Sequence, residues 1–194
     1  MLNKPVDNIV YNSDGTVRGI ESEGETVECD LIVCDPSYAP DQCKKTGSVI
    51  RAICILNHPI KHTDNSNSCQ IIIPRGQINR QNDIYIASVS HSHGVTASPW
   101  FLAIASTVVE TSDPQRELKP ALSMLEPIDR IFYDQSDLFE PQHDGSKNRL
   151  FISKSYDATS HFETTCNDIV DMYRRITGHD IDLSKVDDLE NSNE

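Results

Sequence analysis

The sequence predicts a mixed α/β (α+β) protein with an antiparallel sheet and a C-terminal helix. Three observations carry that prediction. β-Branched and apolar residues recur in short runs, separated by turn residues, over the first 109 positions. Helix-start residues follow only after that point. Apolar residues then recur at helical spacing towards the C-terminus, which indicates an amphipathic helix.

The first 34 residues predict a meander of three strands. The first two are expected at Val6–Tyr11 and Thr16–Ser22, joined by a turn in which Gly15 can adopt positive φ. The third is expected over Thr26–Cys34. Its apolar end, Leu31–Cys34, is typical of a strand that is buried on both faces. We therefore expect Cys34 to pack in a core.

The middle of the chain predicts an antiparallel sheet. Four apolar, β-branched segments are expected to be its strands: Val49–Leu56, Ser68–Pro74, Asp83–Ser90 and Trp100–Val109. A polar loop separates the second segment from the third, so these two are expected to form a hairpin.

Helical signals begin after the sheet. Asp113 is expected to cap a helix that starts at Pro114, because a carboxylate accepts hydrogen bonds from the first turn and proline tolerates the first position. Pro120 is expected to start a second short stretch, which Pro127 ends. A last strand is expected at Leu150–Ser155.

The final helix is expected between residues 164 and 178. Thr164 or Thr165 can cap it, and Gly178 can end it. Its apolar residues at helical spacing are Ile169, Met172, Tyr173 and Ile176. The segment that follows, 179–194, carries six acidic residues against one lysine and is expected to be flexible.

Composition narrows the functional classes. The formal charge of −13 argues against nucleic acid as a partner, because the chain would repel a phosphate backbone. No apolar run approaches the ~20 residues that a membrane helix needs. The six cysteines lack the C-x-x-C spacing of zinc and redox sites, so we expect reduced thiols. Cys29, Cys34 and Cys54 lie among aliphatic residues and are expected to be buried.

Two weak metal candidates can be named. His91 and His93 would face the same way on a strand, so both imidazoles could meet one ion. No third ligand accompanies them, and a polar strand end that leads into Gly94 is the favoured interpretation. The spacing of Cys29 and Cys34 matches no zinc pattern, so a metal role for that pair is not favoured.

Catalytic motifs are missing from the sequence. It contains no phosphate-binding glycine loop, no nucleophile elbow and no G-x-G-x-x-G dinucleotide motif. The segment Ser155–Thr159 precedes the last helix, but without glycine it is expected to be a structural joint. Four acidic residues could be imagined as an acid pair, although solvated carboxylates are the default: Asp137, Glu140, Asp144 and Asp157.

Several sequence segments are similar to those of a known family. They are MLNKPV at 1–6, CDPSY at 34–38, SCQIIIP at 68–74, AIAST at 103–107, LEPID at 125–129 and SYDATSHFETTCNDI at 155–169. In this order they resemble the C-terminal portion of Rab GDP dissociation inhibitors (GDI), which hold prenylated Rab GTPases in the cytosol. The resemblance covers residues 1–178.

The resemblance implies a fold like that of flavoprotein oxidases and monooxygenases, with no flavin in use. Residues 1–178 would be the C-terminal part of the large domain, a partial FAD/NAD(P)-binding-like domain of the GDI type. No cofactor, no metal and no catalysis are expected. Because the family's glycine-rich N-terminus and helical lipid-binding domain are absent, the chain is expected to be a fragment or a truncated gene product.

The implied function is regulation of small GTPases in vesicle traffic and protein transport. The resemblance implies binding of prenylated, GDP-bound Rab, slower GDP release, and recycling of Rab between membranes and cytosol. A cytosolic monomer with transient membrane contact is expected. The Rab-binding residues that carry over are Met1, Leu2 and Asn3, where the Rab-binding platform of the family ends.

An incomplete sheet has a structural consequence. We expect it to leave Leu31–Cys34 and Val49–Leu56 without their neighbours, which exposes strand edges and apolar faces. Poor solubility of the isolated chain is therefore expected.

Two alternatives remain open at this point. A Rab escort protein, which presents Rab to the geranylgeranyl transferase, shares the implied fold; the word SCQIIIP and the short chain end favour the inhibitor. A degenerate flavin-dependent oxidoreductase is the alternative from another class, and flavin absorbance of the purified chain would reveal it.

Overall fold

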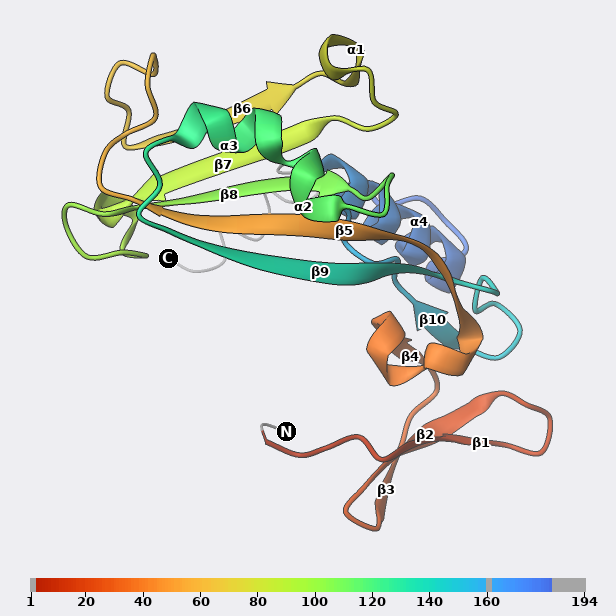
Figure 1. The fold of residues 1–194 in the computed structure, drawn as a ribbon. Helices are drawn as coiled ribbons and strands as arrows, with labels where there is room; N and C mark the ends of the chain where they lie inside the picture. Colours follow the sequence, from red (N-terminus) through yellow and green to blue (C-terminus); the bar gives the residue numbers. More distant parts are fainter. Residues whose placement is uncertain (1–2, 160–161, 183–194) are drawn as a thin grey trace. The chain divides into compact units, whose positions relative to one another are not determined.

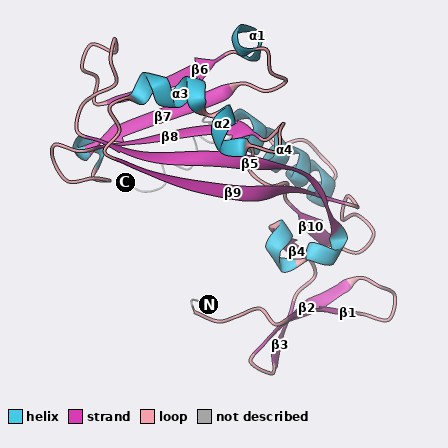
Figure 2. Cartoon of the chain, in the orientation of Figure 1, coloured by secondary structure: helices cyan, strands magenta, loops and turns pink. Residues whose placement is uncertain are grey.

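The computed structural model describes residues 3–159 and 162–182 and shows a mixed α/β chain with antiparallel sheets and a C-terminal helix (Figures 1 and 2). The predicted fold class is confirmed. The chain forms two compact units. Unit 1 consists of residues 1–44, 139–155 and 163–194, and unit 2 of residues 45–138 and 156–162.

A five-stranded sheet dominates unit 2, in the order β6-β7-β8-β5-β9 (Figure 1). Its strands are β5 (Cys43–Leu56), β6 (Ser68–Ile73), β7 (Ile84–Ser90), β8 (Phe101–Val108) and β9 (Arg130–Pro141). The first four are the predicted strands, and their pairing is antiparallel as expected. The loop of the β6–β7 hairpin contains a short helix, α1 (Arg75–Ile78). β5 begins six residues before the predicted start at Val49.

Strand β9 was not predicted from the sequence, and it overturns one expectation. Because β9 lies beside β5, the segment Val49–Leu56 has a neighbour on each side and is not an edge. The amide of Asp129 donates a hydrogen bond to the carbonyl of Ile55 at 3.0 Å, which is a normal length. The Thr46 hydroxyl donates to the carbonyl of Leu138 at 3.3 Å. The start of one strand thus faces the end of the other, so β5 and β9 are antiparallel.

One face of the sheet carries the core of unit 2. The buried side chains alternate along each strand and line up across the sheet, as in the pair Cys54 and Ala103 and the pair Ala52 and Ala105. Two short helices cover this face, α2 (Pro114–Glu117) and α3 (Lys119–Leu125), and α3 contacts β7 and β8. The predicted helix starts are confirmed: the Asp113 carboxylate accepts the amide of Arg116 at 3.3 Å.

Unit 1 contains two small sheets. β1 (Asn8–Tyr11), β2 (Val17–Ser22) and β3 (Glu25–Glu28) form the antiparallel meander, and β4 (Ile32–Cys34) pairs in parallel with β10 (Leu150–Ile152). Two 3-10 turns follow β4, η1 (Pro36–Tyr38) and η2 (Pro40–Gln42). The core of this unit gathers Val17, Ala39, Cys43, Leu150 and Ile152.

The predicted third strand, Thr26–Cys34, is wrong as one element. It is two strands because its halves have different partners: β3 pairs with β2, whereas β4 pairs with β10. The expectation of burial on both faces also fails, since Val33 is 53% exposed. Cys34 does pack against the core of unit 1, although it is only half-buried. Cys29 was expected to be buried, but it is exposed.

Helix α4 (Glu163–Thr177) is the predicted C-terminal helix. It begins one residue before Thr164, so neither proposed threonine is its cap. Met172 is buried as the spacing suggested, whereas Ile169 is 57% exposed. Gly178 follows the last turn with φ of 78°, a conformation that suits glycine. Among the described residues, none of the helices is both long and apolar enough to cross a membrane.

Candidate functional site

The site predicted from the resemblance lies at the start of the chain. Met1 and Leu2 fall outside the described residues. Asn3 is exposed and has φ of 58°, a left-handed conformation that asparagine tolerates. The assignment of these three residues to Rab binding stays a prediction.

The two histidines of the metal candidate do not lie on a strand. β7 ends at Ser90, and His91–His93 form a single 3-10 turn, η3, with exposed side chains. Gly94 closes the turn with φ of 71°. No group of three or more metal-ligating side chains occurs within residues 3–159 and 162–182. The polar turn that leads into Gly94 is therefore the interpretation the structure supports.

Four of the six thiols do not suit nucleophilic chemistry. All six cysteines are free. Burial raises the pKa of Cys54 to about 11, and burial together with the charge of Asp35 raises the pKa of Cys34 to about 11. Burial also raises the pKa of Cys43 and of Cys69. Since the thiolate is the reactive form, these four side chains are protonated and inert near neutral pH.

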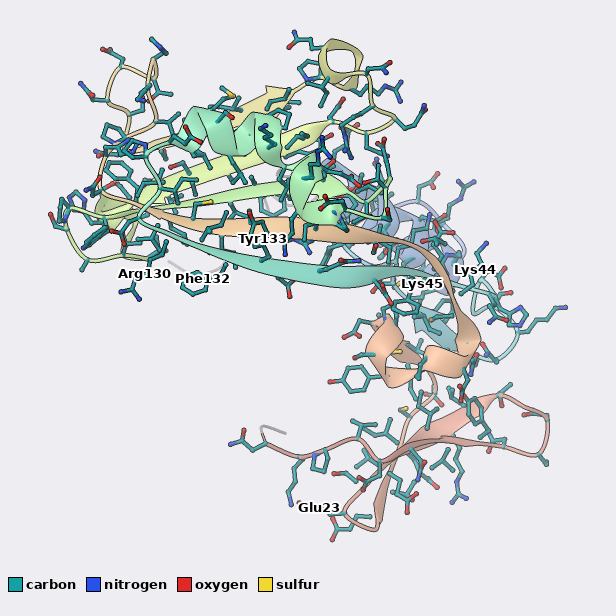
Figure 3. All side chains as sticks on the ribbon, viewed as in Figure 1. Glu23, Lys44, Lys45, Arg130, Phe132 and Tyr133 are labelled. Atoms are coloured by element: carbon teal, nitrogen blue, oxygen red, sulfur yellow. The ribbon has the colours of Figure 1, made fainter. Side chains whose placement is uncertain are left out.

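The four carboxylates considered as acid pairs serve local structure instead. Asp137 pairs with Lys45 at 2.7 Å, and Glu140 lies 3.9 Å from Lys44 (the two lysines are labelled in Figure 3). Asp144 accepts the amide and the hydroxyl of Ser146. Asp157 does the same for Thr159 in the segment that was expected to be a structural joint.

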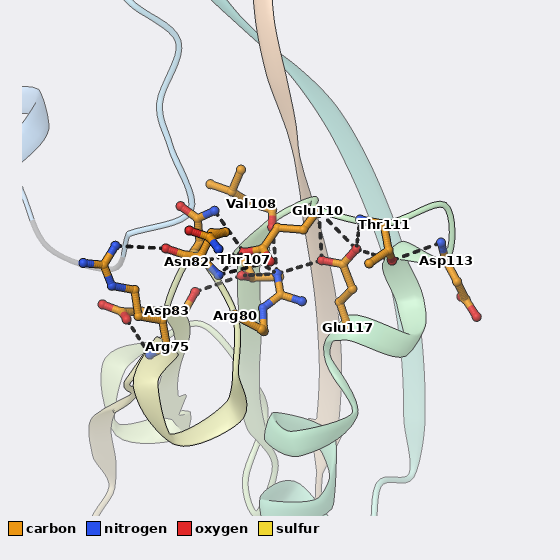
Figure 4. A network of polar contacts seen from close by, with 11 residues as sticks. Arg75, Arg80, Asn82, Asp83, Thr107, Val108, Glu110, Thr111, Asp113 and Glu117 are labelled. Carbon is orange, nitrogen blue, oxygen red and sulfur yellow. Dashed lines mark hydrogen bonds and ion pairs between the residues drawn. The ribbon is translucent and has the colours of Figure 1, made fainter.

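The most developed polar site of unit 2 centres on Arg80, in the loop between β6 and β7 (Figure 4). Its guanidinium lies 2.7 Å from the carboxylate of Glu117 and 3.4 Å from that of Glu110. It also donates to the carbonyl of Val108 at 2.9 Å. The side chains of Arg80 and Glu117 are only 11% and 4% exposed, so the charges neutralise each other away from water.

Both carboxylates of this site also hold backbone. Glu110 accepts the amides of Gln81 and Asn82 at 2.7–3.0 Å. Glu117 accepts the amides of Glu110 and Thr111 at 3.1 and 2.7 Å. Burial would raise the pKa of Glu117, but hydrogen bonds from Thr111 and Arg80 outweigh it and lower the pKa. This network fixes two loops, and both carboxylates are engaged in structural contacts.

A different kind of site lies on the side of the sheet away from α2 and α3. Cross-strand pairing aligns the outward side chains in rows. The first row holds Val89, Leu102 and Ile55, and the second holds Ala87, Ile104 and Ile53. All six are half-buried aliphatic residues. We call these six side chains the open face.

The third row closes one end of the open face. It holds Ser106 and Arg51, which are paired across β8 and β5. The Ser106 hydroxyl donates to the carbonyl of Ala158 at 2.6 Å, and the Arg51 guanidinium donates to the carbonyl of Asp157 at 3.0 Å. The segment around Ala158, which is 3% exposed, thus crosses this row. The two aliphatic rows lie beyond it.

The open face continues onto the edge strand β9. Ile131 packs against the core, whereas Ser136 accepts a hydrogen bond from Arg51 on the opposite side. Even-numbered residues of β9 therefore share the side of the open face, and this set includes Phe132, which is 54% exposed. Figure 3 shows Phe132 projecting from β9 on the side away from α2 and α3.

The sequence carried a signal for this surface that the prediction did not use. In the strands β5 and β8, both alternating sets of residues are apolar, as with Ile53 beside Cys54 and Ile104 beside Ala105. Such a pattern is typical of a strand with both faces covered. Within the described residues of unit 2, α2 and α3 cover the set that faces them, and the two aliphatic rows form the opposite set.

A family model and a curated relative both match this chain along almost its whole length. The family described as "GDI: GDP dissociation inhibitor" matches residues 1–188. Among curated proteins, Rab GDP dissociation inhibitor beta of Rattus norvegicus is 52% identical over 186 residues, which is 96% of this chain. The chain spans 42% of that relative's length.

Among solved structures, the Rab GDI of Plasmodium falciparum matches with a TM-score of 0.91 at 44% identity. The match covers 93% of this chain and 42% of the other.

Proposed function

The chain belongs to the GDP dissociation inhibitor family, and from that premise we propose that it serves as the C-terminal portion of a Rab GDP dissociation inhibitor. In this role it binds GDP-bound, prenylated Rab GTPases and slows the release of GDP. It takes part in recycling Rab between membranes and cytosol. The observation that carries the proposal is the sequence identity to a curated Rab inhibitor along almost the whole chain.

The proposed mechanism is equilibrium capture, in which no bond is made or broken. A prenyl tail favours the membrane by about 0.8 kcal/mol for each buried methylene. A carrier extracts the GTPase only if it offers comparable apolar burial to the lipid and additional contacts to the protein. The share of this mechanism that we propose for the residues of this chain is the contact to the GTPase protein.

The contact residues stay those suggested by the resemblance. Met1, Leu2 and Asn3 are proposed to touch the GTPase at the end of the family's Rab-binding platform. A monomer in the cytosol with transient membrane contact fits this role. No redox or hydrolytic step is part of the proposal.

A retention experiment tests the proposal. The purified chain is immobilised, and prenylated Rab loaded with GDP is passed over it, with GTP-loaded Rab as the matched control. We expect retention of the GDP form at micromolar protein and less of the GTP form. If the GDP form is not retained at these concentrations, the chain does not bind Rab by itself.

A further inference from the structure

We propose that Lys4 and Asp7 are positioning residues for the Rab contact, because they attach the segment that begins at Asn3 to the turn between β2 and β3. The inference rests on the proposed function, in which Met1, Leu2 and Asn3 touch the GTPase. Of these three residues the structure describes Asn3, and all the contacts below lie within unit 1.

The turn between β2 and β3 has a defined shape. Ser22 pairs with Glu25, and the two residues between them, Glu23 and Gly24, have φ of 51° and 80°. Two consecutive positive φ values are typical of a type I′ turn, which matches the twist of the paired strands. Figure 3 shows Glu23 at this turn. The turn therefore offers a fixed point to which a neighbouring segment can be attached.

Asp7 connects the segment before β1 to this turn through two hydrogen bonds. Its amide donates to the carbonyl of Glu21 at 2.8 Å. Its carboxylate accepts the amide of Glu23 at 2.7 Å. A carboxylate that accepts a backbone amide forms a charge-assisted bond, which is stronger than a neutral one. Asp7 thus holds both β2 and the turn that follows it.

Lys4 adds an ion pair at the same turn. Its ammonium group pairs with the carboxylate of Glu23, and both side chains are about half-exposed. Glutamates also occupy positions 21 and 25 of this hairpin, whereas Lys4 is the one basic residue of the first 17 in the sequence. An exposed pair contributes little to the stability of a fold. Its role here is to select where the segment lies.

These contacts restrict the chain next to Asn3. Pro5, between Lys4 and Asp7, fixes its own φ near −65°. A contact segment that is ordered before binding loses less conformational entropy when it binds. Attachment to the turn is therefore expected to strengthen Rab binding without a direct contact from Lys4 or Asp7.

An exchange of charges separates positioning from a direct contact of Lys4 with the GTPase. Lys4→Glu and Glu23→Lys each break the ion pair, and the double variant forms it again with the charges reversed. A positioning role predicts that the double variant recovers what each single variant loses. A direct contact predicts no recovery. Arg18→Glu is the matched control, because it breaks another exposed pair of the same meander, to Glu28 at 2.7 Å.

Hydrogen exchange tests the attachment without a GTPase. Mass spectrometry of the purified chain follows the amides of residues 3–8, corrected for the intrinsic rate of each sequence. We expect exchange to be faster by about threefold or more in Lys4→Glu, Glu23→Lys and Asp7→Ala, because the segment opens more often. The double variant is expected to match the original chain, and so is Arg18→Glu. Equal exchange in the original chain and in Lys4→Glu would overturn the proposal.

Rab dissociation tests the consequence for binding. The variants are placed in a chimera in which this chain replaces the matched part of the rat inhibitor, and the rate at which prenylated, GDP-loaded Rab leaves is measured. We expect about threefold or more faster dissociation from each single variant and recovery in the double variant. The free energy of unfolding is expected to stay the same throughout, which separates positioning from a general loss of fold.

Two outcomes of this measurement are distinct. Single variants that keep the rate of the unsubstituted chimera, or a double variant no better than Lys4→Glu, would overturn the positioning role. A folded, unsubstituted chimera that does not bind Rab would instead contradict the proposed function, and the exchange rates would still decide whether Lys4 and Asp7 hold the segment at Asn3.

Discussion

At the scale of single residues, the buried ion pair of Arg80 and Glu117 is the most consequential contact. Glu117 neutralises a guanidinium that is almost out of water, and it accepts two backbone amides as well. Exposed pairs contribute much less, because water and salt screen them. Arg18 and Glu28 provide such a pair, with side chains 55% and 66% exposed at 2.7 Å.

Glu117→Ala is expected to lower the free energy of unfolding by about 3–5 kcal/mol, since it removes the nearer of the two carboxylates that neutralise the buried Arg80 and the acceptor of two backbone amides. Glu28→Ala, the matched control on the surface, is expected to cost about 1 kcal/mol or less. Urea denaturation of the two variants measures both values. Similar losses for the two would contradict the account of the buried pair.

The same residue predicts a pH dependence. The pKa of Glu117 is held below its ordinary value of 4.5 in the folded chain, although burial opposes this. A carboxylate with a lowered folded pKa stabilises the protein above the unfolded pKa, and this stability is lost as pH falls through the folded pKa. Melting temperature should therefore fall below a pH of about 4.5, and fall less steeply in Glu117→Gln. Parallel curves for the two proteins would argue against the assignment.

At the scale of elements, the sequence predicted the strands and helices that have strong local signals, such as β-branched runs and helix caps. The four strands β5 to β8 have β-branched runs, and the two helix starts have a cap and prolines, so each was found. β9 was missed because its sequence, RIFYDQSDLFEP, mixes acidic and polar residues into an edge strand.

The pairing of strands β3 and β4 was also not predicted. The break between β3 and β4 depends on which strands they meet, and β10 lies more than one hundred residues further along the chain. The open face was missed for a similar reason. Alternating sets of apolar residues in β5 and β8 show that both faces are apolar, but they do not say which face α3 covers.

Helix α3 is expected to stabilise unit 2 through the residues that it buries against the sheet. Leu125 is fully buried in the core of unit 2, whereas its neighbour Met124 is 40% exposed. Leu125→Ala is expected to cost about 2–5 kcal/mol through lost burial and the cavity left behind. Met124→Ala on the same helix is expected to cost about 1 kcal/mol or less. Denaturant titration checks this, and a reversed order would mean that α3 packs differently.

At the scale of the whole molecule, nearly the entire chain matches the GDP dissociation inhibitor family. The words shared with Rab inhibitors predicted the family, which the comparisons confirm. The contact residues could not be settled in the same way, because Met1 and Leu2 lie outside the described residues.

The most direct test is the rate of GDP release from a prenylated Rab in the presence of the chimera that carries this chain within the rat inhibitor. Fluorescently labelled GDP reports the release. The account predicts that the folded chimera slows release as its parent does. A folded chimera that leaves release as fast as from Rab alone would contradict the claim that this chain is a working part of a GDP dissociation inhibitor.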